Sequence, residues 1–296
     1  MNSRLTVTTP DGRSLDVLVH GSDGQPTVFF HHGTPGAPVD FGPIVKVAAE
    51  TGIRVVNYAR PGYAESTEHP GRDVAAAAAD VVAIADALGV TTFATAGASG
   101  GGPHALACVA LRPDRCRAAA TVAGVAPYHA PGLDWLDGMG PENVAEFDAA
   151  TKGIAPLTAF LDEISPALTA VTPEQILTEL DGLLPDVDRR ALEGEIGEFM
   201  ATSFHNALRH GIAGWRDDDL AFVRPWGFDL AAIERPVAVW QGDQDLMVPY
   251  AHGVWLADAI PTARSQLSPG HGHISIAIAS LTEIVTDVCR LAGLIE

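Results

Sequence analysis

The sequence predicts an α/β fold in which a mostly parallel β-sheet carries helices on both faces. Short apolar segments alternate with helical segments up to about residue 127, and the same alternation returns from about residue 230. Between these two parts no convincing strand pattern appears, and helical segments dominate. Because crossover helices cover parallel strands on both sides, this alternation is typical of such sheets. We therefore expect an α/β core formed by residues 1–127 and 230–296, with an all-helical cap, residues 128–229, inserted into it.

The first part of the core begins with a hairpin and continues as alternating strands and helices. The turn sequence Pro10-Asp11-Gly12 separates two apolar segments, residues 5–8 and 15–20, and predicts a β-hairpin. Functional groups gather at the carboxyl ends of the strands in open α/β sheets, so we expect the site in the sequences that follow the strands. The later elements expected here are strands 27–32, 53–58, 91–96 and 116–125 and helices 73–88 and 101–111.

Helical patterns fill the predicted cap. Pro141 and Pro173 stand where the first turn of a helix tolerates proline. The aspartate run 217–219 is expected to be a solvated loop inside the cap. The helices expected in the cap are residues 141–150, 156–168, 173–183, 188–204 and 205–210. The core then resumes with strand 236–240, helix 249–259, strand 264–267 and helix 274–291.

The chain is strongly acidic, with 18 Lys and Arg residues against 37 Asp and Glu residues and a formal net charge of −19. Such a charge repels phosphate backbones and anionic lipids, so nucleic acid and membrane surfaces are poor partners. The N-terminus lacks the apolar segment of a signal peptide, and no run of about 18 apolar residues is present to span a membrane. The spacing of Cys108, Cys116 and Cys289 suits neither zinc nor a disulfide framework. We expect buried thiols, a cytoplasmic location and a small-molecule partner, and the sequence leaves a homo-oligomer open.

Ser99 is the candidate nucleophile. It stands in GASGG (97–101), a G-x-S-x-G pattern between a predicted strand and a predicted helix. At such a sharp turn the serine occupies the apex in a strained conformation, and the flanking glycines let the neighbouring backbone pass. The amide of Gly100 then points toward the place where an oxyanion develops. The alternatives are a flexible glycine-rich loop and a phosphate-binding turn, but the latter would need a lysine after the glycines.

A second amide for the oxyanion is expected in HGTPG (32–36), which follows the strand at 27–32. The backbone N–H of Thr34 is the best candidate, and an ordinary strand-ending turn is the alternative. His32 is expected to order this loop by hydrogen bonding. Because adjacent residues on a strand point to opposite faces, His31 and His32 cannot both bind one metal ion without distortion.

A serine hydroxyl needs a general base, and the base needs a carboxylate that orients it. Two aspartates, Asp243 and Asp245, follow the strand at 236–240. We favour Asp245 as the acid, because Asp243 is better explained as a turn residue that caps local N–H groups.

The base is expected after the last strand, 264–267, where His271 and His273 stand in GHGH (270–273). We favour His273 because it immediately precedes the final helix and Gly272 gives its loop room; His271 is the alternative. A His-x-His metal site is also open to consideration, but no third ligand with suitable spacing stands nearby, so we expect no metal.

Together these residues resemble the α/β-hydrolase superfamily, and the resemblance covers essentially the whole chain. It implies an eight-stranded type of sheet, an acid in D-x-x-V-P, which selects Asp245, and a histidine preceded by glycine, which selects His273. Serine at position 99 argues against relatives that use aspartate there, the dehalogenases and epoxide hydrolases. The shared motifs are HHGTPG (31–36), RPGY (60–63) with EST (65–67), GASGGG (97–102), GDQDLMVP (242–249) and GHGH (270–273).

The resulting expectation is a cofactor-independent hydrolase that cleaves a small to medium, mostly apolar ester, thioester or lactone through an acyl-enzyme on Ser99. A proline-releasing aminopeptidase is one alternative, although its HGGPG loop and the tryptophan after its serine are replaced here by HGTPG and Gly100. A ligand receptor of the same fold with little turnover is the other. Aromatic residues of the cap are candidate cavity walls, with plain core packing as the alternative interpretation. The substrate-contact candidates are His32, His104, Trp135, Trp215 and Trp226, and further cap aromatics considered are Phe147, Phe160, Phe199 and Phe222.

Overall fold

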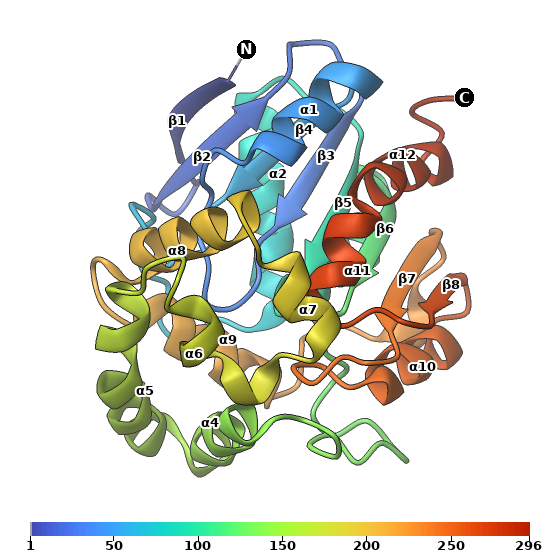
Figure 1. The fold of residues 1–296 in the computed structure, drawn as a ribbon. Coiled ribbons are helices and arrows are strands. Elements are labelled where there is room, and N and C mark those ends of the chain that lie inside the picture. Colours follow the sequence, from blue (N-terminus) through green and yellow to red (C-terminus); the bar gives the residue numbers. More distant parts are fainter. Residues whose placement is uncertain (1) are drawn as a thin grey trace.

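Eight strands form one sheet in the computed structural model, which describes residues 2–296 (Figure 1). The strand order is β1-β2-β4-β3-β5-β6-β7-β8. The pairs β1–β2 and β2–β4 are antiparallel, and every later pair is parallel. The predicted fold class is therefore confirmed. The strands are β1 Asn2–Thr8, β2 Ser14–His20, β3 Thr27–His31, β4 Arg54–Tyr58, β5 Phe93–Ala98, β6 Cys116–Val122, β7 Val237–Gly242 and β8 Ala263–Ser268.

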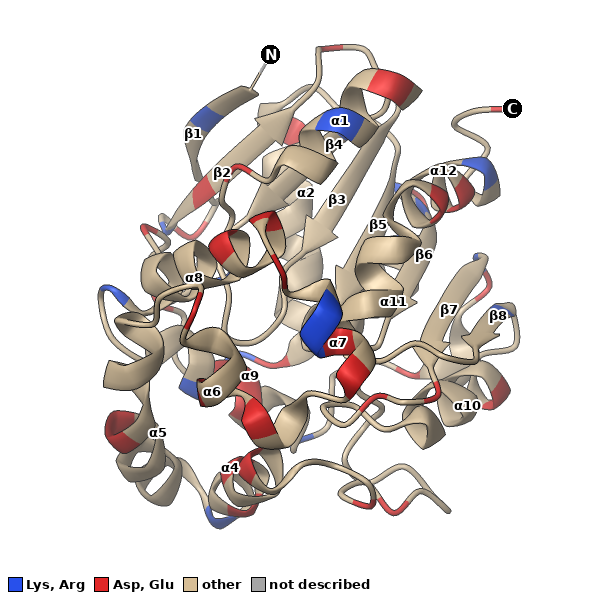
Figure 2. Cartoon of the chain, in the orientation of Figure 1, with Lys and Arg blue, Asp and Glu red and all other residues tan. Residues whose placement is uncertain are grey.

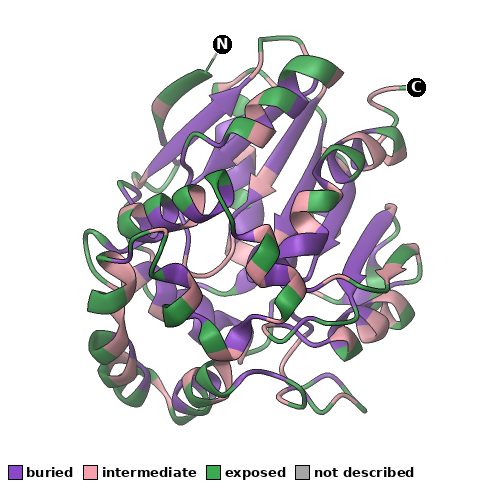
Figure 3. Cartoon of the chain, viewed as in Figure 1, coloured by how far each residue is buried: buried purple, intermediate pink, exposed green. Residues whose placement is uncertain are grey.

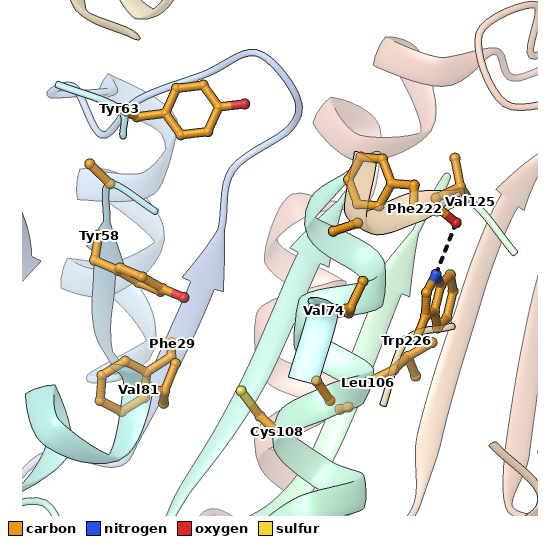
Figure 4. Packing of buried hydrophobic residues seen from close by; sticks show 14 of the residues in the cluster. Phe29, Tyr58, Tyr63, Val74, Val81, Leu106, Cys108, Val125, Phe222 and Trp226 are labelled. Carbon is orange, nitrogen blue, oxygen red and sulfur yellow. Dashed lines mark hydrogen bonds between the residues drawn. The ribbon is translucent and has the colours of Figure 1, made fainter. Parts of the chain in front are cut away.

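Helices cover both faces of the sheet, and two separate apolar clusters fill the layers beneath them. Successive residues of a strand point to opposite faces, so Val28 of β3 joins the cluster under α1 and α12 and Phe29 joins the one under α2 and α3. Figure 4 shows part of the second cluster, and Figure 3 shows that the central strands are buried along most of their length. The helices of the core are α1 Gly42–Thr51, α2 Ala77–Ala87, α3 Gly101–Leu111, α10 Tyr250–Ala259, α11 His273–Ala279 and α12 Leu281–Leu291.

The chain between β6 and β7 forms helices and connecting loops. In Figure 1 these helices lie on the side toward which the arrowheads of β3 and β5 point. Two long helices expected from the sequence are each divided: residues 188–204 at Gly194, which has φ +68°, and residues 274–291 at Ser280. The helices are α4 Pro141–Lys152, α5 Ile154–Thr169, α6 Ile176–Glu179, α7 Asp186–Ala191, α8 Glu195–Leu208 and α9 Ala213–Phe222.

The prediction of a solvated loop at residues 217–219 is wrong. These three aspartates lie within α9 and are buried, with Asp218 and Asp219 fully enclosed. Asp217 pairs with Arg216 at 3.0 Å. Burial and the neighbouring Glu146 carboxyl raise the pKa of Asp219 well above its usual range, which favours the uncharged form. The partners of Asp218 are described below.

Acidic residues are spread over many elements, as Figure 2 shows, and they outnumber the basic ones. The three cysteines are free and buried. Within residues 2–296, the helices are too short or too polar to cross a lipid bilayer.

Candidate active site

Ser99 occupies the turn that joins β5 to α3. Its φ is +54°, in the left-handed region that side chains other than glycine seldom adopt. The strain is held by hydrogen bonds on both sides of the turn: Ser99 N donates to Val122 O at 2.8 Å, and Gly102 N donates to Ser99 O at 2.9 Å. The turn therefore places the serine at the carboxyl end of a central strand, in the kind of strained conformation that gathers at functional sites.

Close backbone approach explains the two glycines that flank this serine. A Cβ atom on Gly97 would lie 2.1 Å from Gly101 O, and one on Gly101 would lie 2.2 Å from His31 O. Both distances are far below any real contact, and both obstacles are backbone atoms. The turn can be this sharp only because the two positions carry no side chain.

Asp245 and His273, which stand 28 residues apart in the sequence, meet in the structure. His273 Nδ1 and Asp245 Oδ2 are 2.8 Å apart. The amides of Met247 and Val248 each donate to Asp245 Oδ1 at 2.8 Å, and Gln241 Nε2 donates to Oδ2 at 3.0 Å. A carboxylate fixed in this way holds the Nδ1–H tautomer of the imidazole and leaves Nε2 free to accept a proton.

The competing aspartate, Asp243, is exposed and accepts a hydrogen bond from Gly270 N at 2.8 Å. This contact ties two loops together at the surface, across 27 residues of the chain, whereas capping of local N–H groups was expected. The contact between His273 and Asp245 leaves His271 without the corresponding carboxylate partner among the hydrogen bonds of the described chain.

Opposing effects set the pKa of His273. Burial lowers it, but the charge of Asp245, the hydrogen bond to that carboxylate and the charge of Asp188 together outweigh burial, and the pKa is raised above its ordinary value. The imidazolium form is therefore stabilised, as a base that takes a proton from a hydroxyl requires.

Ser99 and His273 line the same cavity, whose volume is about 190 Å³. No hydrogen bond joins Ser99 Oγ to the His273 ring; such bonds often tighten only when substrate binds. The polar wall residues besides these two are His32, Asn57 and Ser203, and Asp, Glu, Lys and Arg are absent from the lining that the described chain provides. Apolar walls come from the sheet, α1, α8, α11 and α12, and include Phe30, Phe41, Ile44, Ile196, Phe199, Met200, Phe204, Ile274, Ile278, Leu281 and Ile284.

Of the predicted substrate contacts, only His32 borders this cavity. Its Nδ1 lies 2.7 Å from Gly33 O and its Nε2 accepts from Arg60 N at 3.2 Å, so it also orders the loop as expected. Of the other aromatic residues named from the sequence, Phe199 borders the cavity, and Phe147, Phe160 and Phe222 do not. No sequence signal separated the true walls on α1, α8 and α12 from ordinary core residues.

His104, Trp135, Trp215 and Trp226, expected as substrate contacts, do not border the cavity of Ser99. His104 is buried with Nδ1 2.8 Å from Gly100 O. The three indole N–H groups donate to acceptors inside the protein: Trp135 to Ala126 O at 2.7 Å, Trp215 to Glu146 Oε1 at 2.7 Å, and Trp226 to Phe222 O at 3.3 Å. The last contact is drawn in Figure 4. These aromatic rings pack into the core beside the site.

The segments that carry the two candidate oxyanion donors lie against each other. A Cβ atom on Gly100 would lie 2.4 Å from Thr34 Oγ1 and 2.9 Å from Phe222 Cζ, so only glycine permits this approach. Within residues 2–296, the amides of Thr34 and Gly100 donate no hydrogen bond to a protein atom. Two such amides beside Ser99 are available to an anionic oxygen.

A buried ion cluster holds the Thr34 loop. The Arg60 guanidinium donates to Gly33 O at 3.1 Å and to Thr34 Oγ1 at 2.9 Å, and it pairs with Asp218 at 2.6 Å. Thr34 Oγ1 in turn donates to Asp218 Oδ2 at 2.8 Å. Asp218 also pairs with Arg72 at 2.6 Å. The sequence alone does not reveal this cluster, although Arg60 stands in the RPGY motif.

The charge of Asp218 persists despite complete burial. Burial raises the pKa of its carboxyl, but the guanidinium groups of Arg60 and Arg72 hold the pKa well below its usual range. The carboxylate thus stays ionised and holds Arg60, Arg72 and Thr34 in place.

Comparison with known proteins gives a consistent set of similarities. A family model described as the alpha/beta hydrolase fold matches residues 26–278. A non-heme chloroperoxidase from Streptomyces lividans is 30% identical over 89% of this chain and 88% of its own. A bifunctional esterase/perhydrolase from Acinetobacter calcoaceticus is 34% identical over 90% and 92% of the two chains. The solved structure of a hydrolase from Pseudomonas aeruginosa PA01 superposes with a TM-score of 0.70 at 20% identity, over 98% of both chains.

Replacing Asp218 by asparagine should destabilise the protein strongly. The variant leaves two buried guanidinium groups without their counter-charge, which typically costs about 3–5 kcal/mol of unfolding free energy. Urea unfolding at pH 7 measures the loss. The control is Asp148→Asn, which breaks the exposed pair with Lys152 and should cost less than about 0.5 kcal/mol. Equal, small losses in both variants would show that the buried cluster does not hold the fold together.

Proposed function

The chain belongs to the alpha/beta hydrolase fold family, and from this premise we propose that it is a serine esterase acting on small to medium, mostly apolar carboxylic esters. The observation that carries the proposal is the shared cavity of Ser99 and His273, together with the 2.8 Å contact between His273 Nδ1 and Asp245. Thioesters and lactones present the same carbonyl and belong to the same proposal.

In the proposed mechanism Ser99 Oγ attacks the carbonyl carbon while His273 Nε2 accepts the hydroxyl proton. Asp245 keeps the imidazole in the required tautomer and stabilises the imidazolium that forms. The amides of Thr34 and Gly100 bind the oxyanion of the tetrahedral intermediate, which collapses as His273 protonates the leaving alcohol. Water, deprotonated by the same histidine, then attacks the acyl-enzyme and releases the acid and free Ser99.

The cavity supports an uncharged acyl group of limited size. A dry apolar cavity of roughly 150 Å³ holds a benzene-sized guest, and this one has a volume of about 190 Å³. A peptidase that releases N-terminal proline must hold a free amine, and the lining that residues 2–296 provide contains no carboxylate to do so. The nearby acidic side chains that could hold an amine, Glu193, Glu195 and Glu198, are exposed and do not border the cavity. We therefore favour esters over N-terminal peptides.

We also propose that residues 128–229 act as the cap of this cavity. Helix α8 supplies five of its wall residues, among them Phe199 and Met200, and so covers one side of the space next to Ser99. Because the insertion supplies part of the cavity wall, its residues help to determine which substrates fit.

Fluorophosphonate labelling tests the nucleophile. The intact protein should be labelled at Ser99, and Ser99→Ala should lose the label and several powers of ten in kcat without unfolding. Ser165→Ala, on α5 and outside the cavity, is the control and should behave as the unchanged protein does. In a series of p-nitrophenyl esters, kcat/KM should be highest for acyl chains of about four to eight carbons. Labelling that survives in Ser99→Ala, or activity confined to a proline naphthylamide, would refute the proposal.

The pH dependence of kcat/KM tests the base. Since His273 acts when neutral and its pKa is raised, activity should increase with pH through a pKa above about 6.5. Asp245→Asn removes the carboxylate charge that does most to raise the pKa of His273. The effect of burial, which lowers this pKa, then dominates, and the acid limb should move to lower pH. The same change should lower kcat by up to about 10⁴-fold. An acid limb below pH 6.5 in the unchanged protein would contradict this assignment.

Perhydrolysis is a second candidate activity, and the similarity to a non-heme chloroperoxidase and an esterase/perhydrolase favours it. Hydrogen peroxide would replace water as the acyl acceptor, so that a carboxylic acid and peroxide give a peracid and water at Ser99. We expect peracid in mixtures of acetate and peroxide, detected by oxidation of bromide, and none with Ser99→Ala. Bromide oxidation that Ser99→Ala retains in full would rule this activity out.

A further inference from the structure

Asp188 is a buried carboxylate that contacts the backbone at His273, the proposed base. It lies on α7, in the helical insertion, 85 residues before His273. Its exposed fraction is 0%. Asp188 Oδ2 accepts from His273 N at 2.7 Å, and Oδ1 accepts from Ser275 N at 2.8 Å. Both oxygens act as acceptors, as those of an ionised carboxylate do.

These two amides have no partner of their own in the helix. Helix α11 begins at His273, and the first N–H groups of a helix lack intrahelical acceptors. Asp188 supplies acceptors for two of them, and Ser275 Oγ accepts from Gly272 N at 2.8 Å. The start of α11 is therefore fixed by a side chain from a distant helix.

Because Gly272 has no side chain, the Asp188 carboxylate can approach the backbone at this position. A Cβ atom at position 272 would lie 2.4 Å from Asp188 Oδ2. The glycine before the histidine therefore has a local purpose beyond loop flexibility, because it lets Asp188 reach the backbone of the next residue.

We propose that Asp188 is a positioning residue for His273. Asp245 holds the imidazole ring of His273 at Nδ1, and Asp188 holds the backbone N–H of the same residue. The side chain and the backbone of His273 are therefore fixed by carboxylates from two different segments. One of these segments is the insertion, which thereby takes part in assembling the site. The inference rests on the proposed function, since it assigns Asp188 a task only if His273 is the base.

The charges around His273 give the proposal an electrostatic consequence. The carboxylates that face the ring or its backbone are Asp245 from the loop after β7 and Asp188 from α7, and both raise the pKa of His273. On α7, the neighbouring Arg189 pairs with Asp181 at 2.5 Å. His271 is the other titratable group of the same loop. Removing the charge of Asp188 should therefore lower the pKa of His273.

The test compares Asp188→Asn with Asp186→Asn, which removes the same charge from an exposed position on the same helix. In Asp188→Asn the amide NH₂ group cannot accept the second backbone N–H. We expect kcat to fall by about 10- to 100-fold with KM changed less than about threefold, because the base is displaced while the cavity remains. The acid limb of kcat/KM should move down by roughly 0.5–1 pH unit. Asp186→Asn should change neither quantity.

A folded Asp188→Asn protein with the pH profile and kcat of Asp186→Asn would overturn the proposal, as would a loss confined to KM. A fall in melting temperature with an unmoved acid limb would also overturn it, because a purely structural role predicts that result.

Two measurements remain informative if Asp188→Asn does not fold or if the enzyme assignment fails. Hydrogen exchange in the unchanged protein should show strong protection of the His273 and Ser275 amides, and exchange at the rate of an open first turn would overturn the contact. An NMR titration of the His273 ring reports its pKa without any substrate. Absence of fluorophosphonate labelling in the unchanged protein would instead refute the proposed function, whatever Asp188 does.

Discussion

The buried carboxylate of Asp218 connects loops of the candidate site that the hydrogen bonds of the sheet do not hold. It pairs with Arg60 and Arg72 and accepts a hydrogen bond from Thr34, so it joins the loops after β3 and β4 to helix α9. Buried charges are costly unless every group is paired, and here each oxygen has a guanidinium within 2.6 Å. The glycine-rich loop that carries Thr34 gains from this cluster the fixed geometry that an oxyanion site needs.

The sequence was sufficient to predict the fold class and the turn at Ser99, because both depend on local patterns. Strand and helix periodicity is short in range, and a G-x-S-x-G sequence between a strand and a helix permits few conformations. The close contacts at Gly97 and Gly101 explain why that pattern is informative: no residue with a side chain fits there. The preference for Asp245 and His273 came from their place after successive strands, and the structure puts these two side chains within hydrogen-bond distance.

What the sequence did not reveal depends on contacts between distant residues. Asp218 and Arg60 are 158 positions apart, and nothing near the aspartate run marks it as paired, so it was expected to be solvated. The tryptophans of the insertion were expected to line the cavity, yet their indole N–H groups find acceptors inside the protein, which only tertiary packing decides. The same holds for Asp188, whose partners are backbone amides that no residue pattern identifies.

The two carboxylates contributed by the insertion, Asp188 and Asp218, have a consequence for evolution and engineering. In this protein the segment between β6 and β7 donates hydrogen-bond acceptors to the core at Thr34 and at His273. A chimera that received a foreign segment between β6 and β7 would lose those acceptors along with the cavity wall that α8 supplies. An exchanged segment would therefore have to retain Asp188 and Asp218, or supply equivalent acceptors, before a change in substrate selectivity could be measured.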